Sequence, residues 1–192
     1  MSTATSPRVD GRTVRRLANR DRILDAALDL VAEGAELDAE AIAARADVSV
    51  RSIYNHFPTA RALVAGLYAR SAEKVRPMFD DLPDPSVPFD RRVREWARVW
   101  GHVQEAIAPI RWRALVAEDQ HPDLQPELAQ LRRLHRAEIR HRFPEIAGRR
   151  KLEAIALAMS DSLTWRALRR HQKLSVDAAC EVIEESLRRL VR

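Results

Sequence analysis

The stretch VSVRSIYNHF, residues 48–57, carries two kinds of side chain that a short helix would place on opposite sides. On a helical wheel, Ile53 and Phe57 lie close together on one side. The polar side chains of the opposite side are Arg51, Tyr54 and Asn55. Because a helix of about two turns is marginal alone, we expect its order to come from packing of the apolar pair on neighbouring helices.

A second short helix is predicted just before this stretch. Asp38 is a good N-cap for a helix over residues 39–46, and Asp47 begins a tight turn before Ser49, which caps the next helix. Two short helices joined by such a turn form a helix-turn-helix, whose second helix lies in the major groove of DNA. The sequence therefore predicts a DNA-binding motif at about residues 38–57.

The polar residues of the second helix have the chemistry that a duplex requires. Arg51 can make a bidentate pair with guanine. Ser52 and Asn55 can read bases or bind phosphate, whereas Tyr54 and His56 suit phosphate contacts. The expected DNA contacts are Val50, Arg51, Ser52, Tyr54, Asn55, His56 and Thr59.

The beginning of the chain is locally basic. Residues 1–22 hold six Arg against two Asp, although the whole chain has a net charge of only +5. We interpret residues 1–15 as a flexible basic arm, because Ser, Thr, Pro and Ala dominate its first positions. Salt-dependent contacts to phosphate or to the minor groove are expected from Arg8, Arg12, Arg15 and Arg16.

Helical periodicity extends over the rest of the chain. Apolar residues from Ile23 to Val31 predict a helix that starts near Arg20, and a further helix is expected from Thr59 to about Met78. Three prolines in residues 81–88 indicate a loop. Later helical patterns cover about 89–107, 109–118, 122–142, 147–171 and 175–191. Since no alternating run of strand length occurs, the predicted fold class is all-α.

The segments ILDAALDLVAEG (23–34) and LDAEAIAARADVSVRSIYNHFPTARALV (37–64) resemble the N-terminal domain of TetR/AcrR-type transcriptional regulators. The resemblance covers about residues 16–76 and includes the Tyr54–His56–Phe57–Pro58 signature that closes the recognition helix. It implies DNA contacts from the positions Val50, Arg51, Ser52, Tyr54 and His56. One departure is Asp47, where the family usually has Gly, but Asp also tolerates a left-handed backbone conformation.

The same resemblance implies that residues 80–192 form a helical domain for ligand binding and dimerisation. Residues 147–171 carry two apolar stripes, and a helix that is apolar on two sides needs partners on both. We therefore expect a homodimer through the helices at about 147–171 and 175–191, related by a twofold axis. A pocket for a small apolar or aromatic effector is expected from Trp96, Trp100, Trp112, Met159 and Trp165, with ordinary core packing as the alternative for each.

These predictions combine into a homodimeric repressor that an effector releases from a palindromic operator in double-stranded DNA. A TetR-like activator, or a regulator without an effector, is an alternative. A helical-bundle enzyme is a remote one, because no GxSxG, HExxH or glycine-rich phosphate loop occurs. We expect no cofactor and no metal site. His135, Glu138 and His141 spread widely around one helix among arginines, which favours a solvated surface.

The composition predicts a cytoplasmic protein. Uncharged apolar runs are far shorter than the roughly 20 residues of a membrane span. The first residues have no apolar segment of the kind found in secretory signals, and Cys180 has no second cysteine to pair with. A soluble protein in a reducing compartment is therefore expected.

Overall fold

A computed structural model of the chain describes residues 11–118, 122 and 125–191. Over these residues every regular element is helical and no strand occurs, which confirms the predicted all-α class. The chain divides into two compact units, Met1–Arg70 and Ser71–Arg192. None of the described helices combines the length and the apolar character needed to cross a membrane.

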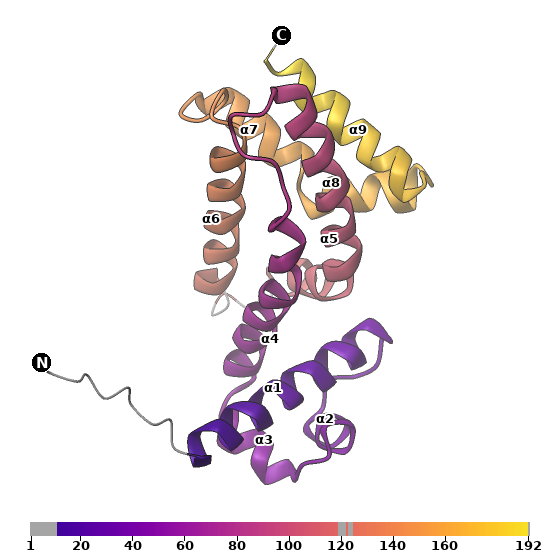
Figure 1. The fold of residues 1–192 in the computed structure, drawn as a ribbon. Helices are drawn as coiled ribbons and strands as arrows, with labels where there is room; N and C mark the ends of the chain where they lie inside the picture. Colours follow the sequence, from indigo (N-terminus) through magenta and orange to yellow (C-terminus); the bar gives the residue numbers. More distant parts are fainter. Residues whose placement is uncertain (1–10, 119–121, 123–124, 192) are drawn as a thin grey trace, which may run out of the picture. The chain divides into compact units, whose positions relative to one another are not determined.

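The first unit is built from three helices and the start of a fourth (Figure 1). They are α1 (Gly11–Ala32), α2 (Ala39–Ala46), α3 (Val50–His56) and α4 (Ala60–Val75). The apolar side of α1 forms the centre of this unit, where Ile23 and Ala27 are fully buried. Arg70 of α4 pairs with Asp25 of α1 at 2.8 Å and so ties these two helices together.

The helix α1 reaches further toward the N-terminus than the sequence indicates. We expected it to start near Arg20, with residues 1–15 as a flexible arm, but the structure is helical from Gly11. Arg12, Arg15 and Arg16 therefore lie on a helix, and Arg8 lies outside the described residues. The apolar pattern missed these turns because they bury almost nothing: Val14 and Leu17 are both about half-exposed.

The helix α4 is shorter than predicted. It ends at Val75, and Arg76–Phe79 forms a 3₁₀ turn, η1, instead of continuing to Met78 as α-helix. Pro77 accounts for the change, since its ring clashes with the preceding turn and it lacks the N–H that an α-helical bond requires. At the other end, the Thr59 hydroxyl accepts a hydrogen bond from the Ala62 N–H at 3.1 Å and caps the helix, as expected.

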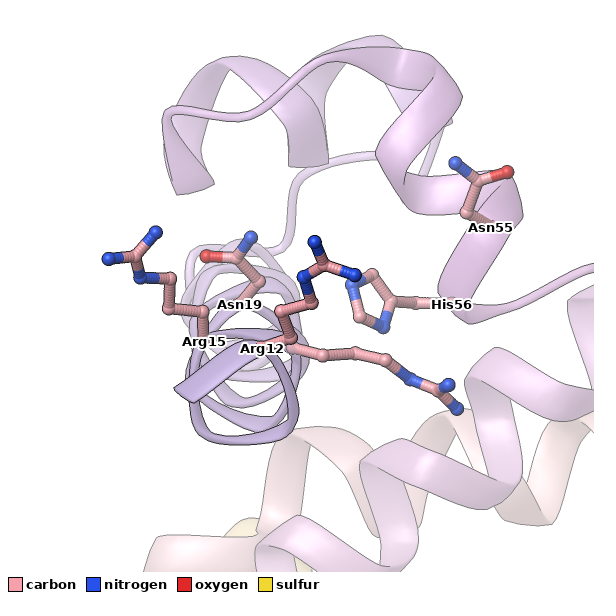
Figure 2. A pocket seen from close by; sticks show the side chains of 6 residues that line it. Arg12, Arg15, Asn19, Asn55 and His56 are labelled. Atoms are coloured by element: carbon pink, nitrogen blue, oxygen red, sulfur yellow. The ribbon is translucent and has the colours of Figure 1, made fainter. Parts of the chain in front are cut away.

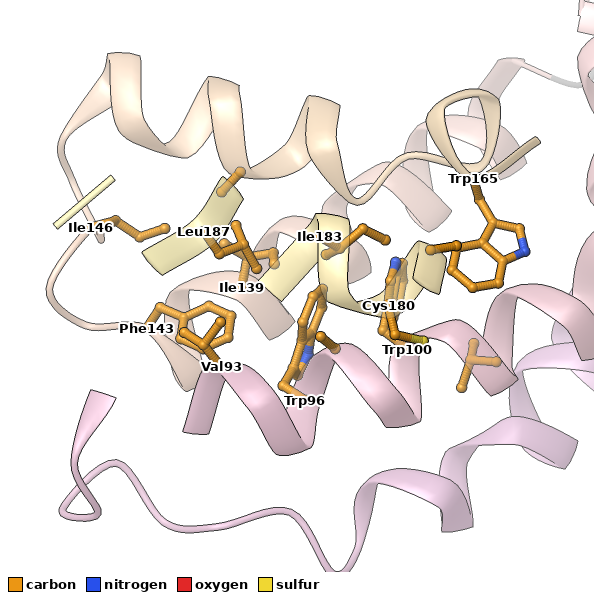
Figure 3. Close-up of a cluster of buried hydrophobic side chains, with 14 residues drawn as sticks. Val93, Trp96, Trp100, Ile139, Phe143, Ile146, Trp165, Cys180, Ile183 and Leu187 are labelled. Atoms are coloured by element: carbon orange, nitrogen blue, oxygen red, sulfur yellow. The ribbon is translucent and has the colours of Figure 1, made fainter. Parts of the chain in front are cut away.

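The second unit packs its helices around one apolar cluster (Figure 3). Its elements after η1 are α5 (Phe89–Glu118), α6 (Gln125–Arg142), α7 (Arg150–Met159), α8 (Ser162–Arg166), the π-helical turn η3 (Ala167–His171) and α9 (Val176–Arg189). The helix α5 is the central element, since Val93, Trp96 and Ala97 on it are almost fully buried.

Two predicted helix boundaries in this unit are wrong. The helix α5 continues through Pro109, where a break was expected, and Ile110 directly after it is buried. Packing of Ile110 therefore offsets the loss of the single backbone hydrogen bond that the proline removes. The predicted helix 147–171 is instead interrupted at Ser160, because the Asp161 side chain accepts the Leu163 N–H at 2.8 Å and starts α8 as its N-cap.

Close approach of α5 and α9 depends on Gly101. A Cβ atom at this position would lie 2.3 Å from Sγ of Cys180 and 2.9 Å from Cη2 of Trp165. Gly101→Ala is therefore expected to lower the free energy of unfolding of this unit by about 1–3 kcal/mol, as overpacking typically does. Urea titration followed by tryptophan fluorescence measures it, because all four Trp residues lie in this unit.

The control for Gly101→Ala is the same change in a Cys180→Ala background. Removing Sγ takes away the closest atom, so the added methyl group should cost less there, and the double-mutant cycle should show coupling. An equal cost in both backgrounds would contradict the packing explanation.

Candidate nucleic-acid interface

The helix α3 has one buried and one exposed side. Ile53 and Phe57 retain only 3% and 4% of their accessible surface, whereas Tyr54 is 59% exposed. Arg51 and Asn55 are exposed as well. The apolar pair therefore holds the helix on its own unit, and the exposed side consists of groups that can bind a nucleic acid.

Local capping fixes how α2 and α3 are joined. Oδ1 of Asp38 accepts the Ala41 N–H at 2.6 Å at the start of α2. Asp47 adopts the left-handed conformation, with φ 52° and ψ 55°, and its N–H bonds back into α2. Oγ of Ser49 then accepts the Ser52 N–H at 3.2 Å and starts α3. The turn therefore has the helix-turn-helix geometry predicted from the sequence, and Asp47 adopts the conformation expected of it.

The residues expected to contact DNA lie on α3 or directly after it. Val50, Ser52 and His56 are half-buried at the edges of the exposed side. Thr59 is exposed, but its hydroxyl is engaged as the cap of α4. Six of these seven residues therefore belong to α3 and Thr59 follows it, and their roles in DNA binding remain predictions.

The structure also brings α1 next to the end of α3. A hollow, which we call the α1–α3 hollow, lies between the two helices, and Figure 2 shows side chains of α1 on one side of it and Asn55 and His56 of α3 on the other. Its lining residues are Arg12, Arg15, Arg16, Asn19, Asn55 and His56. Asn19 is absent from the predicted contacts, because the sequence does not reveal that it lies opposite α3.

Several arginine side chains place positive charge at or beside this hollow. The pKa of His56 is lowered from its ordinary value of 6.5, first by burial and then by the charges of Arg16 and Arg20. Arg20 also lies over the Phe57 ring, with 5.5 Å between its Cζ atom and the ring centroid. The C-terminal end of α3 therefore lies against the arginines of α1.

Comparison with known proteins identifies this domain. Residues 23–67, from the buried side of α1 to Leu67 in α4, match the sequence model of the bacterial regulatory proteins of the tetR family. This part of the chain is therefore similar to the tetR-family regulatory proteins. The predicted resemblance to TetR/AcrR-type regulators is thereby confirmed over these residues.

Solved structures match most of the chain in fold. The multidrug binding protein EbrR, in complex with imidazole, is 24% identical, with a TM-score of 0.70 and coverage of 98% of both chains. A TetR-family member from Streptomyces coelicolor A3 is 23% identical, with a TM-score of 0.67 and coverage of 88% of this chain and 97% of its own. A putative TetR-family regulator from Rhodococcus sp. is 16% identical, with a TM-score of 0.73 and coverage of 91% of this chain and 100% of its own. No curated protein matches the sequence. These likenesses show the fold.

The five residues predicted for an effector pocket do not all lie together in the second unit. Trp96, Trp100 and Trp165 belong to the buried cluster (Figure 3). Trp112 is 41% exposed and is covered on one face by the Arg166 guanidinium, 3.4 Å from the ring centroid. Met159 is half-buried at the end of α7. The structure thus brings three of the five together in the core and leaves Trp112 outside it.

Sequence reasoning missed His135 in this unit. Its ring stacks on Trp100, with centroids 4.6 Å apart, and its Nε2 lies 2.9 Å from Oγ of Ser160. Burial lowers its pKa to about 4. The solvated surface expected for this residue is therefore wrong, because α6 turns His135 toward α5 and toward the break between α7 and α8.

Exposed apolar side chains mark the helices expected to form a dimer. Ile155 on α7, Leu163 on α8 and Val182 on α9 are 43%, 53% and 40% exposed. Large apolar side chains in this state lose favourable burial unless another surface covers them. They lie within the residue ranges that the sequence assigned to dimerisation.

Proposed function

We propose that the protein is a homodimeric repressor that holds a palindromic DNA operator in the cytoplasm and releases it when a small effector binds. The proposal assigns no enzymatic reaction to the chain. Its main support is the exposed side of α3, where Arg51, Tyr54 and Asn55 face outward while Ile53 and Phe57 anchor the helix. Val50, Arg51 and Ser52 lie on the first turn, from which a recognition helix reaches base edges.

Dimerisation follows from the geometry of DNA. One helix of seven residues reads too few base pairs for useful specificity, whereas two copies about 34–36 Å apart read successive major-groove faces of an inverted repeat. The exposed Ile155, Leu163 and Val182 support an interface through α7, α8 and α9. A twofold axis between copies would cover these side chains on both chains at once.

The effector part of the proposal has support from the solved neighbours. EbrR is described as a multidrug binding protein, with one structure in complex with imidazole and another, also 24% identical with a TM-score of 0.69, in complex with ethidium. Ring-shaped ligands of this kind suit aromatic and apolar side chains such as the predicted Trp96, Trp100, Met159 and Trp165, whereas the predicted Trp112 lies outside the core. Release requires only that the effector bind the DNA-incompetent conformation more tightly than the competent one.

Selection from a pool of random duplexes at physiological salt tests the DNA and dimer parts together. The full-length protein is expected to recover an inverted repeat, whose half-sites lie about one helical turn apart. A recovered single half-site would contradict the dimer, and recovery of no sequence would contradict operator binding. A thermal-shift screen, followed by operator release with each stabilising compound, tests the effector. Compounds that stabilise the protein but leave operator binding unchanged would contradict ligand-controlled release.

Arg51→Ala is expected to relax base preference at one position of each half-site. Loss of a bidentate contact to guanine costs about 1–3 kcal/mol of discrimination. The readout is affinity for the selected operator and for its single-base variants. Tyr54→Phe is the control, because it removes a hydroxyl suited to phosphate and should weaken all of these duplexes equally. A uniform loss with Arg51→Ala would contradict a base-reading role.

A further inference from the structure

One tryptophan of the second unit can be reached without opening the core. Trp96, Trp100 and Trp165 are buried, whereas Trp112 on α5 is exposed. The Cζ atom of Arg166 on α8 lies 3.4 Å from the centroid of the Trp112 ring, which is close enough for a cation–π interaction. An accessible aromatic face of this unit is therefore covered only by a guanidinium group.

A second guanidinium group lies beside this pair. Nε of Arg111, the residue before Trp112, donates to Oγ of Ser162 at 3.3 Å. Ser162 and Arg166 are four positions apart on α8, so they lie one turn apart on the same side of that helix. We call Arg111 and Trp112 of α5, together with Ser162 and Arg166 of α8, the α5–α8 seam. It brings two positive charges and one aromatic ring together.

Neither charge of the α5–α8 seam is neutralised by a carboxylate. Arg169, three positions after Arg166, pairs with Glu105 at 2.8 Å. Over the described residues, in contrast, no carboxylate lies at ion-pair distance from Arg111 or Arg166, which are both half-buried. Asp161 is the nearest in sequence, but it accepts a backbone N–H at 2.8 Å as the N-cap of α8. Two half-buried guanidinium groups without a carboxylate favour an anion.

The charge of Arg111 is also felt at His135. The pKa of this ring is lowered first by burial; Asp161 opposes the shift, and Arg111 and Arg136 add to it. Arg136 lies 3.5 Å from the carboxylate of Glu153, whereas Arg111 has only a hydroxyl partner. An anion that pairs with Arg111 would therefore gain a favourable interaction without breaking an existing ion pair.

We propose that the α5–α8 seam binds a flat organic acid, such as an aromatic carboxylate, and that an acid of this class is the effector; this inference rests on the proposed function. The carboxylate pairs with the guanidinium group of Arg111 in bidentate geometry. Arg166 turns from the Trp112 ring to the same carboxylate, and the aromatic ring of the acid takes its place against Trp112. The 3.4 Å contact in the ligand-free chain shows that a flat group fits there.

Binding at the seam acts on a helix that the proposed dimer uses. Arg111 and Arg166 are both contacts between α5 and α8, and both change partners when the acid binds. Leu163 on the same short helix is 53% exposed and belongs to the side chains assigned to the interface between copies. An acid that shifts α8 therefore changes the spacing of the two recognition helices, provided that it binds the shifted form more tightly.

The first test compares three probes that share one ring and differ in charge. Isothermal titration calorimetry of the full-length protein with benzoate, benzamide and benzylamine measures their affinities. Benzoate should bind about tenfold or more tightly than benzamide, as expected for hydrogen bonds between charged groups, and benzylamine should not bind. Equal affinities for benzoate and benzamide, or no binding of benzoate at millimolar concentration, would overturn the proposal.

The second test removes one charge of the seam. Arg111→Gln should bind benzoate about tenfold more weakly and benzamide as before, whereas Arg111→Lys, which keeps the charge, should recover part of the loss. Arg98→Gln is the matched control, because Arg98 is an exposed arginine on the same helix, about 20 Å away by the rise of an α-helix. An equal loss of affinity in Arg98→Gln would assign the effect to net charge and overturn the proposal. Urea titration checks that each variant folds; if Arg111→Gln does not, the three probes and Arg111→Lys decide.

The third test locates the ring of the probe. The indole N–H signals are followed by NMR during titration with benzoate, and the signal of Trp112 is assigned by its loss in Trp112→Phe. Benzoate should shift the Trp112 signal more than those of Trp96, Trp100 and Trp165. A shift confined to these three core residues would place the acid elsewhere and overturn the site.

Operator release separates this inference from the proposed function. Benzoate should release the wild-type protein from the selected operator, and Arg111→Gln should need about tenfold more of it. Benzoate that binds the seam without releasing the operator would overturn the effector role, and so would an equal loss of binding to an unrelated duplex. If the proposed function fails, the wild-type protein recovers no inverted repeat in the selection. If only this inference fails, operator binding persists and responds to benzamide or benzylamine, or to no probe.

Discussion

Replacing Phe57 with alanine is expected to abolish operator binding while the second unit stays folded. Phe57 is 4% exposed, and its ring meets both α1 and α4: Arg20 lies over its face, and a Cβ at Gly66 would lie 2.9 Å from its Cε1. Removing a buried aromatic side chain of this kind costs about 3–5 kcal/mol. The first unit is small, so this is a large part of its stability.

The effect on DNA binding follows from the length of α3. A helix of seven residues cannot maintain itself, so Ile53 and Phe57 supply the packing that keeps it helical. Without Phe57, the side chains of Arg51 and Tyr54 lose their fixed positions. Operator affinity should then fall to the level of the unrelated duplex or below.

Two measurements separate this result from general misfolding. Urea unfolding followed by tryptophan fluorescence reports the second unit alone, since Trp96, Trp100, Trp112 and Trp165 all lie there. Its midpoint should match the wild type, while helical circular dichroism shows an earlier transition from the first unit. Tyr54→Phe is the matched control: it changes an exposed ring of the same helix, so stability should stay within about 0.5 kcal/mol. Retained operator binding by Phe57→Ala would contradict the anchoring role of the buried pair.

The helix-turn-helix could be predicted because its determinants are local. Asp38 and Ser49 cap helices with their own side chains, and Pro58 cannot continue one. The left-handed turn at Asp47 likewise depends on a residue type that tolerates it. Each of these signals is contained within a few residues, so the order of elements follows from the sequence.

The sequence predictions were wrong or incomplete where contacts between distant parts of the chain determine where a helix begins or ends. The first turns of α1 bury little, so no apolar stripe marked them. Pro109 lies inside α5 because packing around Ile110 offsets the lost hydrogen bond. The α1–α3 hollow could not be predicted either, since Asn19 and Asn55 are 36 positions apart in the sequence and meet only in the folded unit.

Acid is expected to lower the free energy of unfolding of the second unit, because His135 becomes protonated. The pKa of this ring is lowered from 6.5 to about 4, chiefly by burial, with Arg111 and Arg136 adding to the effect and Asp161 opposing it. The folded state therefore binds the proton less readily than the unfolded state. The resulting stability is fully present above pH 6.5, and it is lost progressively as the pH falls toward 4. The difference between the two pKa values corresponds to ~3 kcal/mol.

The neutral ring has a defined role in the structure. The Ser160 hydroxyl donates its proton to the Ala156 carbonyl at 2.7 Å, so Nε2 of His135 is the donor in the 2.9 Å contact with Oγ. The Ser160 carbonyl in turn accepts from Nε1 of Trp100 at 2.8 Å and from Nε2 of Gln104 at 3.1 Å. The break between α7 and α8 is thereby held to α5 and α6, and a charged ring would disturb it in this half-buried position.

His135→Phe keeps a flat ring against Trp100 and removes the titrating group, so it should unfold with a weaker pH dependence. The free energy of unfolding is measured by urea titration with tryptophan fluorescence at pH 7.5 and at pH 5. The wild type should lose more stability between these values than His135→Phe, and His141→Phe, an exposed change on the same helix, should behave as the wild type. Glu153 does not blur the comparison: bonds from Arg140 and the Gly148 N–H hold its pKa at about 2, so its contribution is lost only below about pH 4.5. Parallel pH profiles for the wild type and His135→Phe would contradict the assignment, because the half-buried imidazole would then contribute nothing to acid sensitivity.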